Sequence, residues 1–227
     1  MTSELFLVRH AQASFGSANY DRLSELGHRQ ARWLGEHFRA RELAFDRVIC
    51  GHMVRHRETV EGIFQGLGQD LEEPHLDSCW NEFDFDAIVR GYLDAHPDQR
   101  PATNASTAGF SRLLRNALQA WTEDRLPGPL PERWRQFEER VRQGLASVTA
   151  QPGDGRRILL VSSGGAIATA LSQVLQAPAS AMVQMNLQLR NSSVSHLYFN
   201  ARAVHFSGFN HVPHLEQPDR ARSVTYY

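Results

Sequence analysis

The sequence has few cysteines, no long apolar run and almost no net charge. Its 227 residues include only Cys50 and Cys79, too few for the disulfide framework of a small secreted protein. No apolar stretch reaches the length of a membrane-spanning helix, and no signal peptide is recognisable at the N-terminus. The formal net charge of -1 gives no global attraction to nucleic acid or to an anionic membrane. These absences predict a globular protein of the reducing cytoplasm that binds neither nucleic acid nor membrane.

The pattern of apolar residues predicts an α/β fold. Apolar runs without polar alternation, typical of strands buried on both faces, occupy residues 5–8, 48–50 and 158–161. Each run is followed by a polar turn and then by a helical pattern, an order that favours parallel strands with helices on both faces. The length suits one domain with elaborations or two small ones. We predict a single domain, 1–227, built as a three-layer α/β/α sandwich around a mostly parallel sheet.

The middle of the chain has a different pattern. Apolar residues recur at helical spacing over 110–121 and again over 134–148. Long insertions over a sheet often carry substrate-binding residues. We therefore predict that residues 81–130 form a helical insertion over the active site that acts as a lid.

Local signals also predict the elements on either side of this insertion. Ser24 can cap a helix whose apolar face follows it, and residues 53–64 are predicted to form the next helix. Residues 194–199 and 203–206 have the pattern of two strands of a hairpin. The tail 217–227 is predicted to be mobile or peripheral.

Polar residues suited to phosphate binding follow all three buried strands. Arg9 and His10 follow the first strand, residues 52–55 the second and residues 162–165 the third. Ligands of open α/β sheets bind beyond the carboxyl ends of the strands, so we expect these segments to meet at one crevice. Guanidinium groups and helix N-termini both bind phosphate well. The sequence therefore predicts a pocket for phosphate or another oxyanion around a nucleophilic histidine.

Five motifs, in order, resemble those of the histidine phosphatase superfamily, also called the phosphoglycerate mutase-like family. Residues 7–12, Leu-Val-Arg-His-Ala-Gln, resemble its opening motif, and segments 23–31, 51–59, 80–83 and 160–165 resemble the motifs that follow. The matches cover nearly the whole chain. The first motif is quite specific, and the others are informative as an ordered set.

The resemblance implies a catalytic role for four residues. His10 attacks phosphorus and becomes a phosphohistidine. Glu82 protonates the leaving oxygen and then activates the water that cleaves the phosphoenzyme. Arg9 and Arg55 bind the phosphoryl oxygens and stabilise their charge. No metal ion or other cofactor is expected, because the arginines supply the positive charge.

One position departs from the family pattern. Ser163 stands where the late motif normally has a histidine, and Gly164 follows it at the start of a predicted helix; both are expected to bind phosphate. A serine hydroxyl donates a hydrogen bond but carries no charge. Because a charge-assisted hydrogen bond is worth roughly 1.5–3 kcal/mol, the exchange predicts a rate about ten- to a hundredfold lower. His52, His56 and His211 are candidates for the missing donor.

The predicted function is hydrolysis of a small phosphomonoester through a phosphohistidine on His10. Mutase activity is the less favoured alternative, because no Tyr-x-x-Pro-Pro segment of the glycolytic mutases follows Glu82. A catalytically impaired protein that binds a phosphorylated ligand or partner is another alternative. Neither the physiological substrate nor the oligomeric state can be inferred from the sequence, which leaves a homodimer open.

Two further interpretations are disfavoured by the residues themselves. A serine between a strand and a helix is typical of the nucleophile elbow of esterases, but that motif needs glycine two residues before the serine, where Val161 stands. The spacing of His52 and His56 is typical of a zinc-protease helix, but the glutamate of that motif is missing. We therefore expect neither a serine nucleophile nor a metal site.

Overall fold

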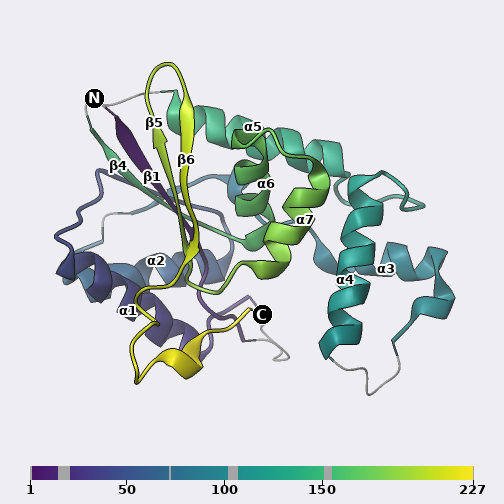
Figure 1. The fold of residues 1–227 in the computed structure, drawn as a ribbon, viewed down its shortest axis with the longest axis horizontal. Helices are drawn as coiled ribbons and strands as arrows, with labels where there is room; N and C mark the ends of the chain where they lie inside the picture. Colours follow the sequence, from purple (N-terminus) through teal and green to yellow (C-terminus); the bar gives the residue numbers. More distant parts are fainter. Residues whose placement is uncertain (1, 15–20, 72, 102–106, 151–154, 227) are drawn as a thin grey trace.

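The molecule has three layers, with a six-stranded sheet between two layers of helices (Figure 1). The computed structural model describes residues 2–14, 21–71, 73–101, 107–150 and 155–226. The strands are β1 (Ser3–Arg9), β2 (Arg47–Cys50), β3 (His75–Leu76), β4 (Arg157–Ser162), β5 (Val194–Phe199) and β6 (Val204–His211). The helices are α1 (Glu25–Ala40), α2 (Val54–Leu67), α3 (Phe85–Ala95), α4 (Thr107–Thr122), α5 (Trp134–Thr149), α6 (Gly164–Val174) and α7 (Ala179–Gln188). Short 3-10 helices lie at η1 (Ser78–Trp80), η2 (Pro97–Gln99) and η3 (Ala221–Ser223).

The sheet confirms the predicted α/β architecture. Its strand order is β3-β2-β4-β1-β5-β6. Strands β1, β2, β3 and β4 are parallel, β5 pairs antiparallel with β1, and β6 pairs antiparallel with β5. In the register, Arg9 lies opposite Ser162 and Cys50 lies opposite Val161. The carboxyl ends of β1, β2 and β4 therefore meet at one edge of the sheet, where ligands of such sheets bind.

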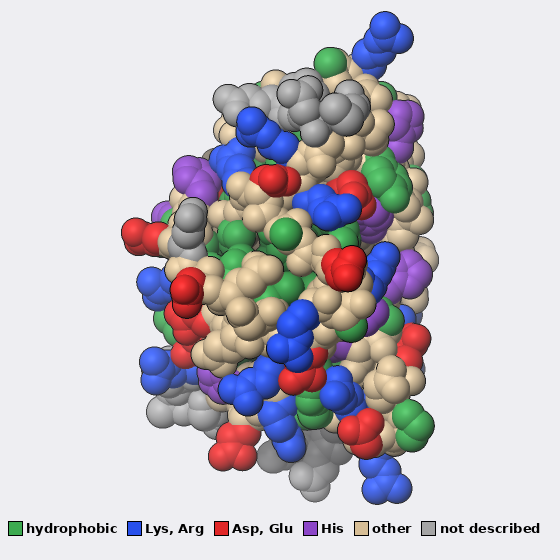
Figure 2. All heavy atoms as spheres, turned by 90° about the vertical axis from the view of Figure 1, so that its left-hand side faces the viewer, with side chains coloured by type: hydrophobic (Ala, Val, Ile, Leu, Met, Phe, Trp, Pro, Cys, Tyr) green, Lys and Arg blue, Asp and Glu red, His purple; other side chains and the backbone are tan. Residues whose placement is uncertain are grey.

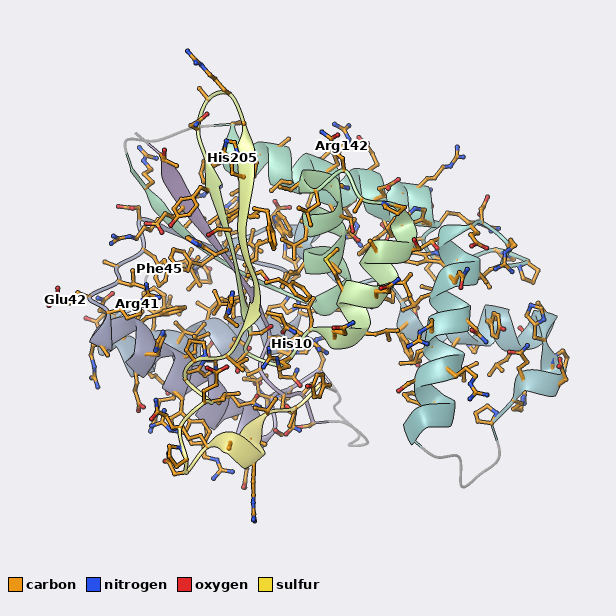
Figure 3. The ribbon with its side chains drawn as sticks, in the orientation of Figure 1. His10, Arg41, Glu42, Phe45, Arg142 and His205 are labelled. Carbon is orange, nitrogen blue, oxygen red and sulfur yellow. The ribbon has the colours of Figure 1, made fainter. Side chains whose placement is uncertain are left out.

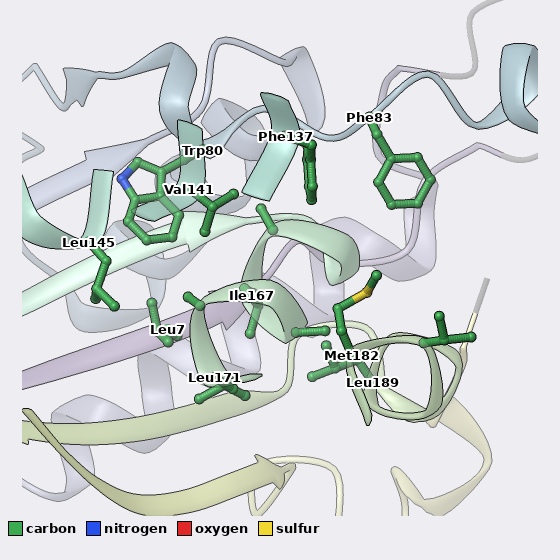
Figure 4. Packing of buried hydrophobic residues seen from close by; sticks show 14 of the residues in the cluster. Leu7, Trp80, Phe83, Phe137, Val141, Leu145, Ile167, Leu171, Met182 and Leu189 are labelled. Atoms are coloured by element: carbon green, nitrogen blue, oxygen red, sulfur yellow. The ribbon is translucent and has the colours of Figure 1, made fainter. Parts of the chain in front are cut away.

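Alternate residues of the central strands are buried on opposite faces of the sheet. Leu5 and Leu7 belong to one apolar cluster, whereas Phe6 and Val8 belong to another. The first cluster includes residues of α5, α6 and α7, and Figure 4 shows Leu7 in it among Trp80, Val141 and Ile167. The second cluster includes residues of α1 and α2. Burial on both faces explains why these strands lack polar alternation.

Helices α1 and α2 lie against each other with glycine at the contact. The predicted cap is present, because the side chain of Ser24 accepts a hydrogen bond from the Gly27 N–H at 3.0 Å. A Cβ atom on Gly35 of α1 would overlap the carbonyl oxygen of Ile63, and one on Gly66 of α2 would overlap that of Arg32. The two backbones therefore approach more closely than larger residues would allow. This contact fixes α2, whose first turn carries Arg55 and His56.

Alanine at position 35 should destabilise the protein. The added methyl group must push α2 away from α1, and overpacking of this kind costs about 1–3 kcal/mol of unfolding free energy. Urea unfolding followed by circular dichroism measures the effect. The matched control is Glu61→Ala on the exposed side of α2, which should change stability by less than about 0.5 kcal/mol. Equal stability of the two variants would contradict the close contact.

The segment 81–130 contains α3 and α4, which lie beyond α7 at one end of the molecule (Figure 1). Helix α4 contacts both α3 and α7. Residues 102–106, part of the connection between α3 and α4, lie outside the described residues. That the segment acts as a lid stays a prediction.

The hairpin was correctly predicted for β5, while β6 extends to His211, five residues beyond the predicted end of that strand.

The C-terminal tail, predicted to be mobile or peripheral, is mostly exposed, yet it is hydrogen-bonded to buried side chains and backbone of the core. The side-chain amide of Gln30 donates to the Ser223 carbonyl at 2.7 Å, and the Asn191 N–H donates to the Thr225 carbonyl at 2.9 Å. Gln30 and Asn191 are both fully buried. The Thr225 hydroxyl also accepts from Gln30 and donates to Asn191. Hydrogen bonds of this kind leave no signal in the hydropathy of the sequence.

The surface and the thiols are ordinary for a globular protein. Arginine and acidic side chains are interspersed on the face shown in Figure 2. Among the described residues, no helix is both long and apolar enough to cross a membrane. Cys50 is a buried free thiol, as predicted, and burial raises its pKa to about 12.

Candidate active site

His10 lies directly after β1, at the edge of the sheet where the three strands end (Figure 3). Its backbone N–H donates to the Ser162 carbonyl at 2.8 Å, and its own carbonyl accepts from the Ser192 N–H at 3.2 Å. The ring Nδ1 lies 2.8 Å from the Ala11 carbonyl. A carbonyl can only accept, so Nδ1 carries the proton in the neutral ring and Nε2 keeps its lone pair.

The surroundings of His10 keep its ring neutral. The side chain is only 5% exposed. Burial, followed by the positive charges of Arg55 and Arg9, holds the pKa of His10 well below its ordinary value. A neutral imidazole with a lone pair on Nε2 is a nucleophile over the whole physiological pH range.

Arg9 binds two backbone carbonyls at the edge of the site. Its Nη1 donates to the carbonyl of Tyr226 at 2.8 Å and also to that of Leu189. Gly164 lies close by, because a Cβ atom there would be 3.6 Å from Nε of Arg9 and 2.5 Å from Oδ1 of Asn186. The guanidinium group and the first turn of α6 are therefore neighbours, as a phosphate site requires.

Arg55 enters the site from the first turn of α2 and is buried. Its Nη1 pairs with the Asp21 carboxylate at 2.7 Å. The other oxygen of Asp21 accepts from the Val54 N–H at 2.9 Å, so this carboxylate also lies at the N-terminus of α2. Nη2 of Arg55 lies 3.4 Å from the Ser163 hydroxyl, which places the second predicted arginine beside the late motif.

Ser163 occupies the N-cap position of α6, but its side chain does not cap the helix. The hydroxyl oxygen instead lies 2.7 Å from Nε2 of His56. Both residues are buried, and the His56 ring centroid is 5.7 Å from that of His10. Of the three histidines considered as donors, His56 is the one that the structure places beside Ser163.

The contact between Ser163 and His56 does not form a catalytic triad of the esterase type. A triad needs a carboxylate that orients the histidine. Among the described residues, no carboxylate hydrogen-bonds to His56; the backbone of Gly51 faces its ring instead. The contact therefore adds no support to the disfavoured interpretation of Ser163 as a nucleophile.

Glu82 lies against the start of α6. Its carboxylate accepts hydrogen bonds from the Gly165 N–H at 2.9 Å and from the Phe83 N–H at 3.2 Å. Burial raises the pKa of Glu82, while these two donors and Arg55 oppose the rise. A Cβ atom on Gly165 would overlap the Glu82 carboxyl group and the Phe83 ring. Position 165 must therefore stay glycine for the carboxyl group to come this close.

The loop that carries Glu82 is fixed to the core by Arg140 of α5. Nη1 of Arg140 donates to the carbonyls of Ser78, Cys79 and Asn81, at 3.1, 3.0 and 2.9 Å. The neighbouring carbonyl of Trp80 accepts from the Ser162 hydroxyl at 2.7 Å. These contacts anchor the loop to β4, so the carboxyl group is held in place rather than left on a mobile connection.

Two of the proposed auxiliary histidines lie away from Ser163. The side chain of His52 is exposed, and only its backbone N–H is bound locally, to Oδ1 of Asn81 at 2.7 Å. His211 ends β6, where its ring lies over Gly208. The sequence interpretation failed because it used proximity to a strand end, whereas the direction of each side chain depends on the helix or strand that carries it.

Sequence reasoning did not identify several residues that shape the site. Asp21 pairs with Arg55 from a loop that no motif marks. Thr59 ties the loop after β1 to α2, because its hydroxyl accepts from the Ala11 N–H at 3.1 Å and donates to the Arg55 carbonyl at 2.7 Å. Thr59 belongs to the second arginine motif, so its spacing from Arg55 could have identified it.

The catalytic and binding roles of the predicted site residues remain predictions, but the fold brings these residues together at one edge of the sheet. They are His10, Glu82, Arg9, Arg55, Ser163 and Gly164. No group of three or more histidine, cysteine or acidic side chains is placed to hold a metal ion among the described residues. The chemistry on hand is a neutral imidazole, two guanidinium groups, a carboxyl group of raised pKa and a helix start. This set can bind a phosphoryl group and attack it.

Comparison with known proteins identifies the family. The profile of the histidine phosphatase superfamily (branch 1) matches residues 5–212. The chain belongs to this superfamily. It is 30% identical to the probable phosphoglycerate mutase GpmB of Salmonella choleraesuis (strain SC-B67) over 226 residues, which cover 95% of this chain and 96% of the relative.

Solved structures with the same fold include both mutases and phosphatases. A phosphoglycerate mutase from Bacillus anthracis superposes with a TM-score of 0.66 at 16% identity, over 94% of this chain and 95% of that one. The mycobacterial glucosyl-3-phosphoglycerate phosphatase superposes with a TM-score of 0.63 at 19% identity, over 92% and 99% of the two chains. At these identities the similarity shows the shared fold alone.

Proposed function

We propose that the protein is a phosphomonoester hydrolase that works through a phosphohistidine on His10. The observation that carries this proposal is the bond from Nδ1 of His10 to the Ala11 carbonyl. It leaves a lone pair on Nε2 of a buried, neutral ring with Arg9 and Arg55 beside it. A pocket that only bound phosphate would need the arginines but not this nucleophile.

The first half-reaction transfers the phosphoryl group to the enzyme. Nε2 of His10 attacks phosphorus, the phosphorus–oxygen ester bond breaks, and the leaving oxygen takes the proton of Glu82. Arg9 and Arg55 bind the equatorial oxygens, where negative charge must be stabilised. The raised pKa of Glu82 supports this step, because a carboxyl group must be protonated to act as an acid.

The second half-reaction releases phosphate. The Glu82 carboxylate takes a proton from water as the water oxygen attacks phosphorus, and the phosphorus–nitrogen bond breaks. Inorganic phosphate leaves, and both His10 and Glu82 return to their starting protonation states. The steps draw on imidazole, guanidinium and carboxyl groups of this chain alone.

The substrate class that we propose is a small phosphomonoester. Relatives named as mutases make transfer to a second hydroxyl the main competing outcome, and binding without turnover is the other. Free thiols at Cys50 and Cys79 support a place in the reducing cytoplasm.

A trapped phosphoenzyme tests the proposal. The protein is mixed with a radiolabelled phosphomonoester such as p-nitrophenyl phosphate and quenched in alkali, and label and free phosphate are counted. We expect label that is stable in base and lost in acid, on the peptide with His10. The chain contains no lysine, so phospholysine cannot give a signal of this kind. Binding of phosphate with neither label nor release would overturn the proposal, and label passing mainly to an added hydroxyl acceptor would favour a mutase.

A further inference from the structure

We infer that Ser163 and His56 together do the work of one charged histidine, with Ser163 touching the phosphoryl group and His56 supplying the proton behind it. The inference rests on the proposed function. In this arrangement Ser163 is the binding residue, and His56 is a positioning residue that acts through it. The pair would offset the loss of charge at position 163.

The geometry places the two side chains in one line of hydrogen bonds. Nε2 of His56 is 2.7 Å from the Ser163 hydroxyl, which also lies 3.4 Å from Nη2 of Arg55. Ser163 has the N-cap position of α6, where a serine side chain usually binds a helix N–H. It makes no such bond. The hydroxyl therefore contacts His56 and Arg55 rather than the helix backbone.

In the described part of the chain, no carboxylate contributes to the pKa shift of His56. Burial and Arg55 of α2 hold its pKa well below the ordinary value, and the backbone of Gly51 opposes this in part. Its other polar neighbours are the His10 ring, 5.7 Å away between centroids, and Ser163. The ring is therefore neutral, and its bare nitrogen Nε2 accepts the Ser163 proton. Ser163 then has no proton to give to a ligand.

A bound phosphoryl dianion reverses this arrangement. Its charge lies beside Arg55 and His10 and favours the protonated imidazole of His56. A proton taken from solvent on Nε2 makes His56 the donor and the Ser163 oxygen the acceptor. The Ser163 proton is then free to bind a phosphoryl oxygen. Each dianion bound should thus draw one proton onto His56.

Proton uptake on sulfate binding tests the pair. Sulfate is a dianion that does not titrate near neutral pH, so any proton taken up goes to the protein. Calorimetry in two buffers of different ionisation enthalpy gives the number of protons. We expect the uptake by His56→Thr to be about one proton smaller than that of the unaltered protein. Ser163→Thr keeps the hydroxyl and should retain the uptake.

Moving the histidine tests the same pair by activity. His56→Thr should lower kcat/KM about ten- to a hundredfold. Adding Ser163→His to that variant returns an imidazole to the same space and should restore most of the loss. Ser163→His alone should bring no gain, because His56 already occupies the space. Thermal melting of each variant shows whether it is folded.

The outcomes separate the inference from the proposed function. A protein that forms no phosphoenzyme refutes the proposed function, whereas one that labels His10 and keeps full kcat/KM in a folded His56→Thr refutes the inference alone. Unchanged proton uptake in His56→Thr also refutes it. If His56→Thr does not fold, nitrogen NMR of the histidine rings in the unaltered protein tests the inference instead. Sulfate must then shift the Nε2 signal of His56 to the protonated range.

Discussion

Alanine at position 10 should abolish the phosphoenzyme and lower kcat by roughly 10³-fold or more, because the variant lacks the proposed nucleophile. Labelling and phosphate release are measured side by side on the purified variant. Arg9 and Arg55 remain, so the variant should still bind inorganic phosphate or sulfate. Loss of turnover with binding retained is the expected pattern.

The matched control for this experiment is His28→Ala, which removes an exposed histidine from α1. It should label and turn over like the unaltered protein. Circular dichroism and melting should show both variants folded. A His10→Ala protein that still acquires acid-labile label would place the nucleophile elsewhere and remove the basis of the proposed mechanism.

Glutamine at position 82 should slow the phosphorylation of His10 by substrates with poor leaving groups far more than by substrates with good ones. Hydrolysis of an alkyl phosphate, whose leaving oxygen needs a proton, should fall about 10²- to 10⁴-fold. p-Nitrophenol leaves without that proton, so p-nitrophenyl phosphate should still phosphorylate His10. Without a carboxylate to activate water, the phosphoenzyme should then accumulate. Rapid-quench kinetics on the two substrates measures both effects.

The pH profile gives a second measurement on the same variant. Burial raises the pKa of Glu82, so its protonated form persists to higher pH than that of an ordinary carboxyl group. Alkyl phosphate hydrolysis should therefore decline as the pH rises above this pKa, and the decline should be missing in Glu82→Gln. The exposed neighbour Asp84→Asn is the control, because it removes a carboxylate while the asparagine oxygen can still accept the α3 cap bond from Ala87. Equal losses for alkyl and p-nitrophenyl phosphates would contradict the role of an acid.

Much of the fold could be predicted because it follows from burial. Leu5 to Val8 carry apolar side chains toward both faces of the sheet, and this shows in the sequence as an uninterrupted run. The carboxyl ends of such strands must meet, which brings His10, Arg55 and Ser163 to one place before any coordinates are known. The predicted set of site residues therefore follows from topology together with motif order.

Side-chain direction could not be predicted in the same way. His52 and His56 both follow the end of β2, two and six residues beyond Cys50, yet His52 is exposed and His56 is buried. The difference arises because α2 begins between them, at Val54. His52 precedes the helix, whereas His56 lies in its first turn, on the buried side. The contacts of the tail could not be predicted for another reason: several of them use backbone carbonyls, which every residue has.

The carbonyls that Arg9 binds have a consequence for ligand exchange. Transfer of a guanidinium group to a dry site is unfavourable unless other dipoles replace its water. In the free protein Tyr226 and Leu189 supply those dipoles to Arg9, and Asp21 does so for Arg55. In the proposed mechanism, an arriving phosphoryl group replaces these peptide and carboxylate oxygens. The same oxygens can return when phosphate departs, which keeps the positive charge solvated through both halves of a turnover and favours quick release of product.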